Sequence, residues 1–178
     1  MKIIIKILCV LLRIPAQIKG MKFGKDSFIG PGYEYIFVKF KNISIGNNVM
    51  IGGHAWLHSE DSGRIIIKDN TQIGKNVVIS SKKSITIGSN CLFSYRVSLL
   101  DYNHEFRNKE IAPVNDVLTE GKAIVIGDDC FIGANSFILQ GVKLGKHCVV
   151  GASSVVTKSF PAYSIVAGIP AKIIRKIT

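Results

Sequence analysis

The residues best suited to chemistry lie in one long polar stretch between Leu99 and Ile126, which holds Asp101, His104 and Glu105. An imidazole titrates near neutral pH, so His104 could take a proton from a hydroxyl as a general base. Asp101 or Glu105 could hold the ring and favour its protonated form, as carboxylates do in hydrolytic triads. An ordinary surface-loop histidine is the alternative, and the spacing alone leaves both interpretations open.

Other sequence signatures of enzymes are missing from the chain. There is no Gly-x-Ser-x-Gly elbow, no Walker-type phosphate loop and no dinucleotide-binding fingerprint. No Cys-x-x-Cys pair and no pair of histidines has metal-ligand spacing, so we expect no metal site. Cys91, Cys130 and Cys148 fall at small inward positions of the repeat described next, which predicts buried free thiols in a reducing, cytoplasmic compartment.

An aliphatic residue recurs at every sixth position beyond that stretch, and this repeat must position His104. A helix would space its apolar residues three and four apart and a strand two apart, so a period of six indicates short straight segments separated by corners. His54 and His147 fall at corner positions otherwise held by asparagine, where a left-handed backbone is expected. The pattern predicts a parallel β-helix of hexapeptide repeats, in which each coil buries its apolar side against the next. The repeating aliphatic positions after the loop are Ile126, Ile132, Ile138, Leu144, Val150 and Val156.

The chain divides into three segments. Residues 1–20 are apolar and basic and predict a helix, residues 21–160 carry the β-helix with its loop at 100–125, and residues 161–178 form a tail with a short C-terminal helix. The first segment is too short and too charged to span a bilayer, and no convincing cleavage site follows it. It would cap the first coil or pack on a neighbouring subunit. Alternatively, residues 1–19 would rest on the inner membrane face as a basic interfacial helix.

The composition fits one domain with an anionic partner. The 178 residues are 47% hydrophobic and carry a formal net charge of +11. Such an excess of basic residues favours nucleic acid, an anionic membrane surface or a phosphate-bearing cofactor as partner. The net charge by itself does not choose among these three.

Three runs of residues carry a family resemblance. Residues 124–135 read IVIGDDCFIGAN, residues 141–158 include GVKLG and GASSVVTK, and residues 167–172 read AGIPAK. In this order and spacing they resemble the hexapeptide-repeat acetyltransferases, which include galactoside, maltose and xenobiotic acetyltransferases and O-acetyltransferases of bacterial surface polysaccharides. The resemblance implies an all-β, left-handed parallel β-helix, a homotrimer with active sites between its subunits, and acetyl-CoA as donor. With that donor as the anionic partner, no nucleic acid is expected.

The resemblance also implies roles for single residues. His104 occupies the place of the family's base, so the acceptor hydroxyl would attack the thioester directly, without an acyl-enzyme. Ala134 and Ala152 would contact the pantetheine arm through their backbones, and Phe131 stands where many relatives place a tryptophan against the cofactor. The other implied residues are Thr157 and Lys158 along the cofactor and Lys172 and Arg175 at its phosphates, with a solvated basic tail as the alternative for the last two.

The acceptor side departs from the galactoside branch of the family. Arg96 stands where galactoside-type relatives have an asparagine, which favours an acidic or phosphorylated sugar. The run Asp101-Tyr102-Asn103-His104 resembles the surface-polysaccharide branch, which implies that Tyr102 and Asn103 bind the acceptor. We therefore expect O-acetylation of a sugar hydroxyl in a surface polysaccharide or its precursor. The alternatives are N-acetylation of an amino sugar, acetylation of a small molecule such as serine or an antibiotic, and a non-catalytic β-helix binding protein.

Overall fold

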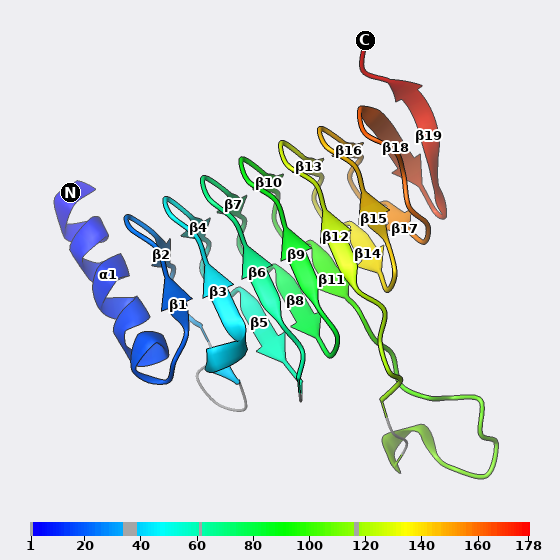
Figure 1. Cartoon of the computed structure of the whole chain (residues 1–178), viewed down its shortest axis with the longest axis horizontal. Coiled ribbons are helices and arrows are strands. Elements are labelled where there is room, and N and C mark those ends of the chain that lie inside the picture. Colours follow the sequence, from blue (N-terminus) through cyan, green and yellow to red (C-terminus); the bar gives the residue numbers. More distant parts are fainter. Residues whose placement is uncertain (1, 34–38, 61, 116–117) are drawn as a thin grey trace.

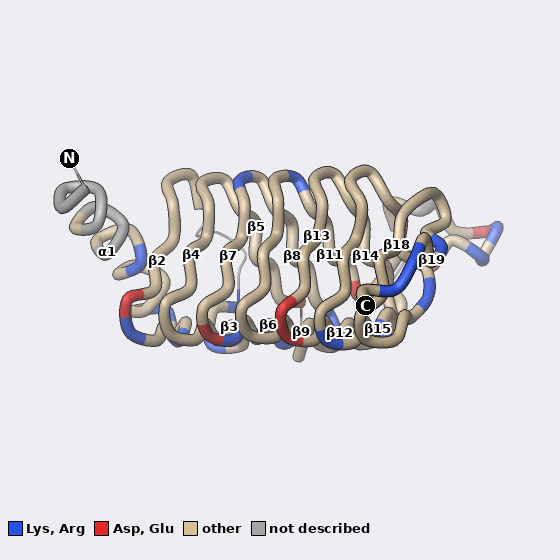
Figure 2. The backbone as a smooth tube through the Cα atoms, turned by 90° about the horizontal axis from the view of Figure 1, so that it is seen from above, with Lys and Arg blue, Asp and Glu red and all other residues tan. Residues whose placement is uncertain are grey.

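The chain folds into stacked coils that form a three-sided prism (Figure 1). This computed structural model describes residues 2–33, 39–60, 62–115 and 118–178, without the side chains of residues 2–6, 8–10 and 113. Helix α1 (Lys2–Ile18) lies at one end of the prism and a β-hairpin at the other. Seen from above, successive coils line up in a single row (Figure 2). The parallel β-helix predicted from the six-residue period is confirmed.

Each side of the prism is one sheet, in which the strands of successive coils pair in parallel register. Two short 3-10 turns, Phe40–Asn42 and Pro113–Asn115, lie outside the sheets. Sheet A holds β1 (Lys22–Phe23), β3 (Ile43–Ile45), β6 (Ile65–Ile67), β9 (Ile85–Ile87), β12 (Ile124–Ile126) and β15 (Lys143–Leu144). Sheet B holds β2 (Phe28–Ile29), β4 (Met50–Ile51), β7 (Gln72–Ile73), β10 (Leu92–Phe93), β13 (Phe131–Ile132), β16 (Val149–Val150), β18 (Ser164–Gly168) and β19 (Ala171–Lys176). Sheet C holds β5 (Trp56–Ser59), β8 (Val78–Ser81), β11 (Ser98–Leu100), β14 (Phe137–Leu139) and β17 (Val155–Val156).

The core is a set of columns in which the same kind of side chain stacks from coil to coil. In sheet A, Ile43, Ile65, Ile85 and Ile124 follow one another in register, and all four are fully buried. Burying each such side chain contributes about 1.5–3 kcal/mol, but only when the coils above and below are present. The predicted small inward positions are buried as well, including the free cysteines Cys91, Cys130 and Cys148.

Two of the three prism edges turn through a left-handed residue. At the edge between sheets A and B and at the edge between sheets B and C, the turning residue has φ near +57°. His147 and His54 are two of these residues, both with φ of 57°, so the prediction that they are corner residues is confirmed. Glycines let the coils approach at these edges, since a Cβ on Gly74 would come within 2.6 Å of the Ser94 backbone.

Helix α1 covers the open end of the first coil, as the capping interpretation predicted. Ala16 is fully buried, and Leu12 packs against the core cluster. The Arg13 guanidinium donates a hydrogen bond of 2.6 Å to the backbone carbonyl of Ser27. The helix thereby covers the apolar surface of the first coil, which has no preceding coil to bury it.

The short C-terminal helix predicted for residues 161–178 is wrong. Strand β18 pairs in parallel with β16, so the coils continue to Gly168, and β19 folds back on β18 in an antiparallel hairpin. The tail is rich in β-branched residues, among them Ile165, Val166 and Ile173, which favour strands. Pairing with β16 also covers the edge of the sheet, a contact that a helix would not supply.

Candidate active site

The long loop between β11 and β12 leaves the prism at the edge between sheets C and A and projects away from it (Figure 1). At its start the Asp101 carboxylate is fully buried and accepts hydrogen bonds from the Ser81 hydroxyl at 2.7 Å, the Lys82 N–H at 2.7 Å and the Lys83 N–H at 3.1 Å. The backbone carbonyl of Asp101 accepts a bond of 2.6 Å from the N–H of Lys122, at the loop's end. Asp101 therefore fastens both ends of the loop to the preceding coil.

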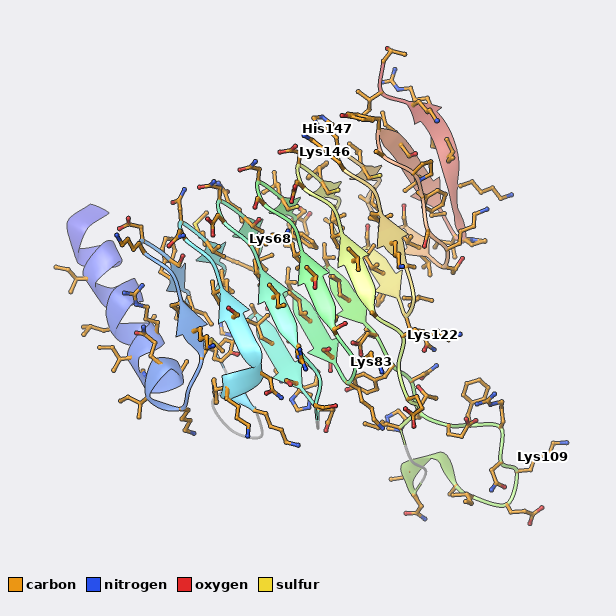
Figure 3. All side chains as sticks on the ribbon, viewed as in Figure 1. Lys68, Lys83, Lys109, Lys122, Lys146 and His147 are labelled. Carbon is orange, nitrogen blue, oxygen red and sulfur yellow. The ribbon has the colours of Figure 1, made fainter. Side chains whose placement is uncertain are left out.

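Tyr102 strengthens the same attachment. Its hydroxyl shares a hydrogen bond of 2.8 Å with the Ser80 hydroxyl, and burial is the main reason that the pKa of Tyr102 is raised. Lys82 adds a third link, donating from its ammonium group to the Leu118 carbonyl at 2.9 Å. Figure 3 shows Lys83 and Lys122 at this root of the loop and Lys109 at its far end. Tyr102 was predicted to bind the acceptor, and its hydroxyl is bonded to that of Ser80 in this chain.

His104 stands just beyond this root, in a narrow neck formed by the two arms of the loop. Asn103 and Thr119 exchange two hydrogen bonds of 2.8 and 3.0 Å across the neck, and His104 forms a bridge to Leu118. The His104 N–H donates to the Asn103 side-chain oxygen at 2.9 Å. His104 itself is exposed, so its imidazole is open to a partner.

Neither carboxylate proposed to orient His104 is bonded to it within the described residues. Asp101 is committed to the loop root, and Glu105 pairs with Arg107, which lowers the pKa of Glu105 to about 2 through hydrogen bonds from the guanidinium. The Asp101 carboxylate therefore holds the root of the loop that carries His104. That a carboxylate orients the His104 imidazole stays a prediction.

The inner side of the loop forms a pocket of about 610 Å³ next to the His104 ring. Polar and charged residues line it from both arms, and Gln140 contributes from the coil below. A pocket of this size and polarity is suited to a sugar-sized group. The residues that line it are Asn103, His104, Glu105, Phe106, Arg107, Leu118, Thr119, Glu120, Gly121, Lys122 and Gln140.

We predict that removing the Asp101 carboxylate loosens the loop and lowers turnover. In Asp101→Ala the Ser81 hydroxyl and two backbone N–H groups lose their acceptor, so the free energy of unfolding should fall by about 1–3 kcal/mol. Misplacement of His104 should lower kcat by about 10–100-fold. Urea denaturation and a turnover assay measure the two effects. Ser81→Ala, which removes one of the three donors, is the matched control with smaller losses, and unchanged turnover in Asp101→Ala would refute the positioning role.

The edge between sheets B and C carries several of the other predicted residues. Backbone hydrogen bonds join successive coils along this edge. The Arg96 N–H donates to the Lys75 carbonyl at 2.9 Å, and the Ser153 N–H donates to the Ala134 carbonyl at 2.8 Å. Ala152, next to Ser153, is exposed on the same edge. A groove of about 510 Å³ follows the edge over two coils, and its lining residues are Gly74, Lys75, Asn76, Ser94, Tyr95 and Arg96. Lys75 is a second cation beside Arg96 that the sequence did not single out.

Phe131 and the predicted phosphate-binding residues share the outer face of sheet B. Phe131 pairs with Val149, Val149 with Ile165, and Ile165 with Arg175, so these side chains lie on one face. Lys172 pairs with Ala167, two residues from Ile165 on the same side of the strand. A register shift in the hairpin brings Lys172 and Arg175 to this common face, although they are three residues apart.

Thr157 and Lys158 are exposed just beyond β17, at the end of sheet C. The Lys158 ammonium lies 5.9 Å from the centre of the Phe160 ring. These two residues lie apart from the sheet B face that carries Phe131, Lys172 and Arg175. Their place along the cofactor stays a prediction.

Within one chain the two halves of the candidate site lie on different edges of the prism. The loop with His104 leaves between sheets C and A, whereas Arg96, Ala134 and Ala152 lie between sheets B and C. Sheet C separates them. No cluster of three or more histidine, cysteine or acidic residues suited to a metal ion occurs in the described part of the chain. None of the described helices is both long and apolar enough to cross a membrane.

A family model, related sequences and solved structures agree on the kind of protein that this chain resembles. The family described as the hexapeptide repeat of succinyl-transferase matches residues 64–93 and 123–158. The chain is 37% identical over 142 residues to WbbJ of Escherichia coli K12, a protein named for O-acetyl transfer in lipopolysaccharide biosynthesis, and the match spans 76% of this chain and 72% of WbbJ.

Two solved structures show the same fold. AntD, an N-acyltransferase from Bacillus cereus solved with dTDP-4-amino-4,6-dideoxyglucose and coenzyme A, matches with a TM-score of 0.78 at 22% identity, over 95% of this chain and 88% of AntD. VCA0836 of Vibrio cholerae, a hexapeptide-repeat acetyltransferase solved with acetyl coenzyme A, matches with a TM-score of 0.59 at 27% identity, over 95% and 78% of the two chains.

Proposed function

The chain belongs to the hexapeptide-repeat acetyltransferases, and on this premise we propose that it transfers acetyl from acetyl-CoA to a sugar hydroxyl of a bacterial surface polysaccharide or its precursor. The observation that carries the proposal is the exposed His104, held on a loop whose root is fastened by a buried carboxylate. The name of WbbJ supports a sugar hydroxyl as acceptor. AntD, an N-acyltransferase, shares the fold at lower identity. The experiment below therefore distinguishes O-acetylation from N-acetylation.

We propose that the active site forms between two subunits of a homotrimer. Sheet C separates the loop from the edge with Ala134 and Ala152, so a single chain does not bring the two halves together. The outer faces of sheets B and C keep large apolar side chains partly exposed, which a second copy would cover. These side chains are Met50, Trp56, Leu92, Phe131 and Phe137.

His104 would act as general base on the acceptor. Its imidazole takes the proton of the sugar hydroxyl while the hydroxyl oxygen attacks the thioester carbonyl. When the tetrahedral intermediate collapses, the carbon–sulfur bond breaks and the imidazolium returns the proton to the leaving thiolate. A backbone N–H at the oxyanion would contribute about 3 kcal/mol to stabilising the transition state.

The outer face of sheet B is suited to the donor. Phe131 offers an apolar wall, and Lys172 and Arg175 on the same face offer fixed cations for the phosphates of coenzyme A. The backbones of Ala134 and Ala152 line the neighbouring edge, where the pantetheine arm would run. Since acetyl-CoA is made in the cytoplasm and the described cysteines are free and buried, we place the reaction in the cytoplasm.

The test of the proposed function is acceptor-dependent thiol release from acetyl-CoA. Hydroxyl sugars and amino sugars of matched structure are compared, and the product is mapped by mass spectrometry and NMR. Esters on hydroxyl groups support O-acetyl transfer. Amides would move the function to N-acetylation, and the absence of both thiol release and acetyl-CoA binding would leave a non-catalytic β-helix.

Arg96 should select the charge of the acceptor. Arg96 and Lys75 flank the groove at the edge between sheets B and C, so two cations face a ligand there. We predict that Arg96→Ala raises the KM of an acidic or phosphorylated sugar by about 10-fold or more, because a charge-assisted hydrogen bond to the acceptor is lost. The KM of acetyl-CoA should change little. Lys75→Ala should give a smaller rise. An unchanged acceptor KM in Arg96→Ala would argue for a neutral acceptor.

A further inference from the structure

Helix α1 keeps an aliphatic stripe in solvent although its other side is already buried. Ile7, Leu11, Ile14 and Ile18 follow one another at intervals of four, three and four residues, which places them on one face. Their exposed fractions are 55, 53, 41 and 81%. Ala16 and Leu12 on the opposite side pack against the first coil, so capping the prism does not require this stripe. We call Ile7, Leu11, Ile14 and Ile18 the α1 stripe.

The end of the prism that carries the α1 stripe also concentrates positive charge. Residues 1–42 hold 8 basic and 2 acidic side chains, a net charge of +6, while the remaining 136 residues hold 15 and 10, a net charge of +5. Figure 2 shows basic positions near the end of α1 and on the first coil. The exposed basic residues of this end include Lys22, Lys25, Lys39 and Lys41.

We propose that the α1 stripe and its basic surroundings dock the enzyme on an anionic phospholipid surface. An apolar helix face beside basic side chains is the arrangement that lies in the interface plane, with aliphatic residues among the acyl chains and ammonium groups at the headgroups. The helix has 17 residues and is therefore about 25 Å long, and it binds along its side because it is not long and apolar enough to cross.

Charge complementarity favours a lipid surface over a second copy of the chain. Two copies joined through their α1 stripes would bring together two ends that each carry a net charge of +6, and like charges at an interface oppose association. An anionic bilayer supplies both the apolar layer and the opposite charge. Docking through α1 also leaves the loop with His104 free, because the loop projects from the other half of the prism (Figure 1).

The test is co-sedimentation of the full-length protein with vesicles. We expect binding to vesicles of phosphatidylcholine with one third phosphatidylglycerol, and little binding to phosphatidylcholine alone or at high salt. The double variant Leu11→Ser/Ile18→Ser should weaken binding to the anionic vesicles by about 10-fold or more. Lys22→Gln/Lys25→Gln should weaken it less and reduce its salt dependence.

The control is Ile66→Ser/Val125→Ser, which removes two exposed aliphatic residues from the outer face of sheet A and should bind like the wild type. Equal binding by all the variants would overturn the proposal. A changed oligomeric state of Leu11→Ser/Ile18→Ser would also overturn it and assign the α1 stripe to a subunit contact. Acetyl transfer to a water-soluble acceptor, measured without vesicles, should be the same in the stripe variant, so this test is independent of the proposed function.

Discussion

Replacing His104 with alanine should lower kcat by about 10²–10⁴-fold, the range that a positioned general base contributes. The hydroxyl would then attack the thioester without transferring its proton to the protein, while binding of acetyl-CoA would remain, because the residues proposed to hold it lie elsewhere. The measurement is thiol release at saturating acceptor, together with calorimetric titration of coenzyme A. His104 is exposed on a loop that projects from the prism (Figure 1), so the melting temperature should not change.

Lys109→Ala is the matched control for this experiment. Lys109 lies at the far end of the same loop (Figure 3), so its replacement tests whether any change in the loop lowers turnover. We expect near wild-type kcat from Lys109→Ala. A His104→Ala protein that keeps its turnover to within a few-fold would return His104 to the ordinary surface-loop histidine that the sequence left open.

The fold was predictable because the information is local and repeated. The aliphatic residue at every sixth position predicts which side chains enter the buried column that contains Ile126 and Leu144, and each coil repeats the same pattern. The left-handed backbone at His54 was predictable for the same reason, since asparagine holds the equivalent corner in other coils. Repetition lets a pattern be read even where one coil departs from it.

The last coil and the loop root were not predictable, because both depend on contacts between distant residues. The tail contains β19, whose strand conformation depends on antiparallel pairing with β18, and the six-residue repeat of the preceding coils does not predict a hairpin. Asp101 has the sequence spacing of a partner for His104, yet its carboxylate is bonded to Ser81, Lys82 and Lys83, about one coil away along the chain. Spacing shows which groups could meet, and burial decides which groups do.

The shared face of Phe131, Lys172 and Arg175 is a third case of this kind. Regular alternation along a strand would place Lys172 and Arg175 on opposite faces, which would favour the solvated basic tail. The register shift between Ile165 and Val166 reverses that expectation. A bulge has no signature in this stretch of sequence, and it converts two scattered cations into a pair on the face that also carries Phe131.

If the site is shared between subunits, two inactive variants should restore each other. His104→Ala lacks the base, and Ala152→Trp should block the edge along which the pantetheine arm would run, since Ala152 is exposed there. Each protein alone should be inactive. In a cyclic trimer that contains both chains, one interface joins an intact His104 to an intact edge, so about one third of the wild-type turnover should return.

The measurement uses the two variants co-expressed with different tags, and mixed trimers purified on both tags. The control is a trimer in which the chains with either tag are all His104→Ala. None of its interfaces contains the base, so it should stay inactive. The mass of each preparation establishes that trimers are compared with trimers. Recovered turnover in the mixed trimer alone requires that His104 of one chain acts beside the Ala152 edge of its neighbour, since sheet C separates the two within a chain. Mixed trimers as inactive as their parents would place the whole reaction within single subunits.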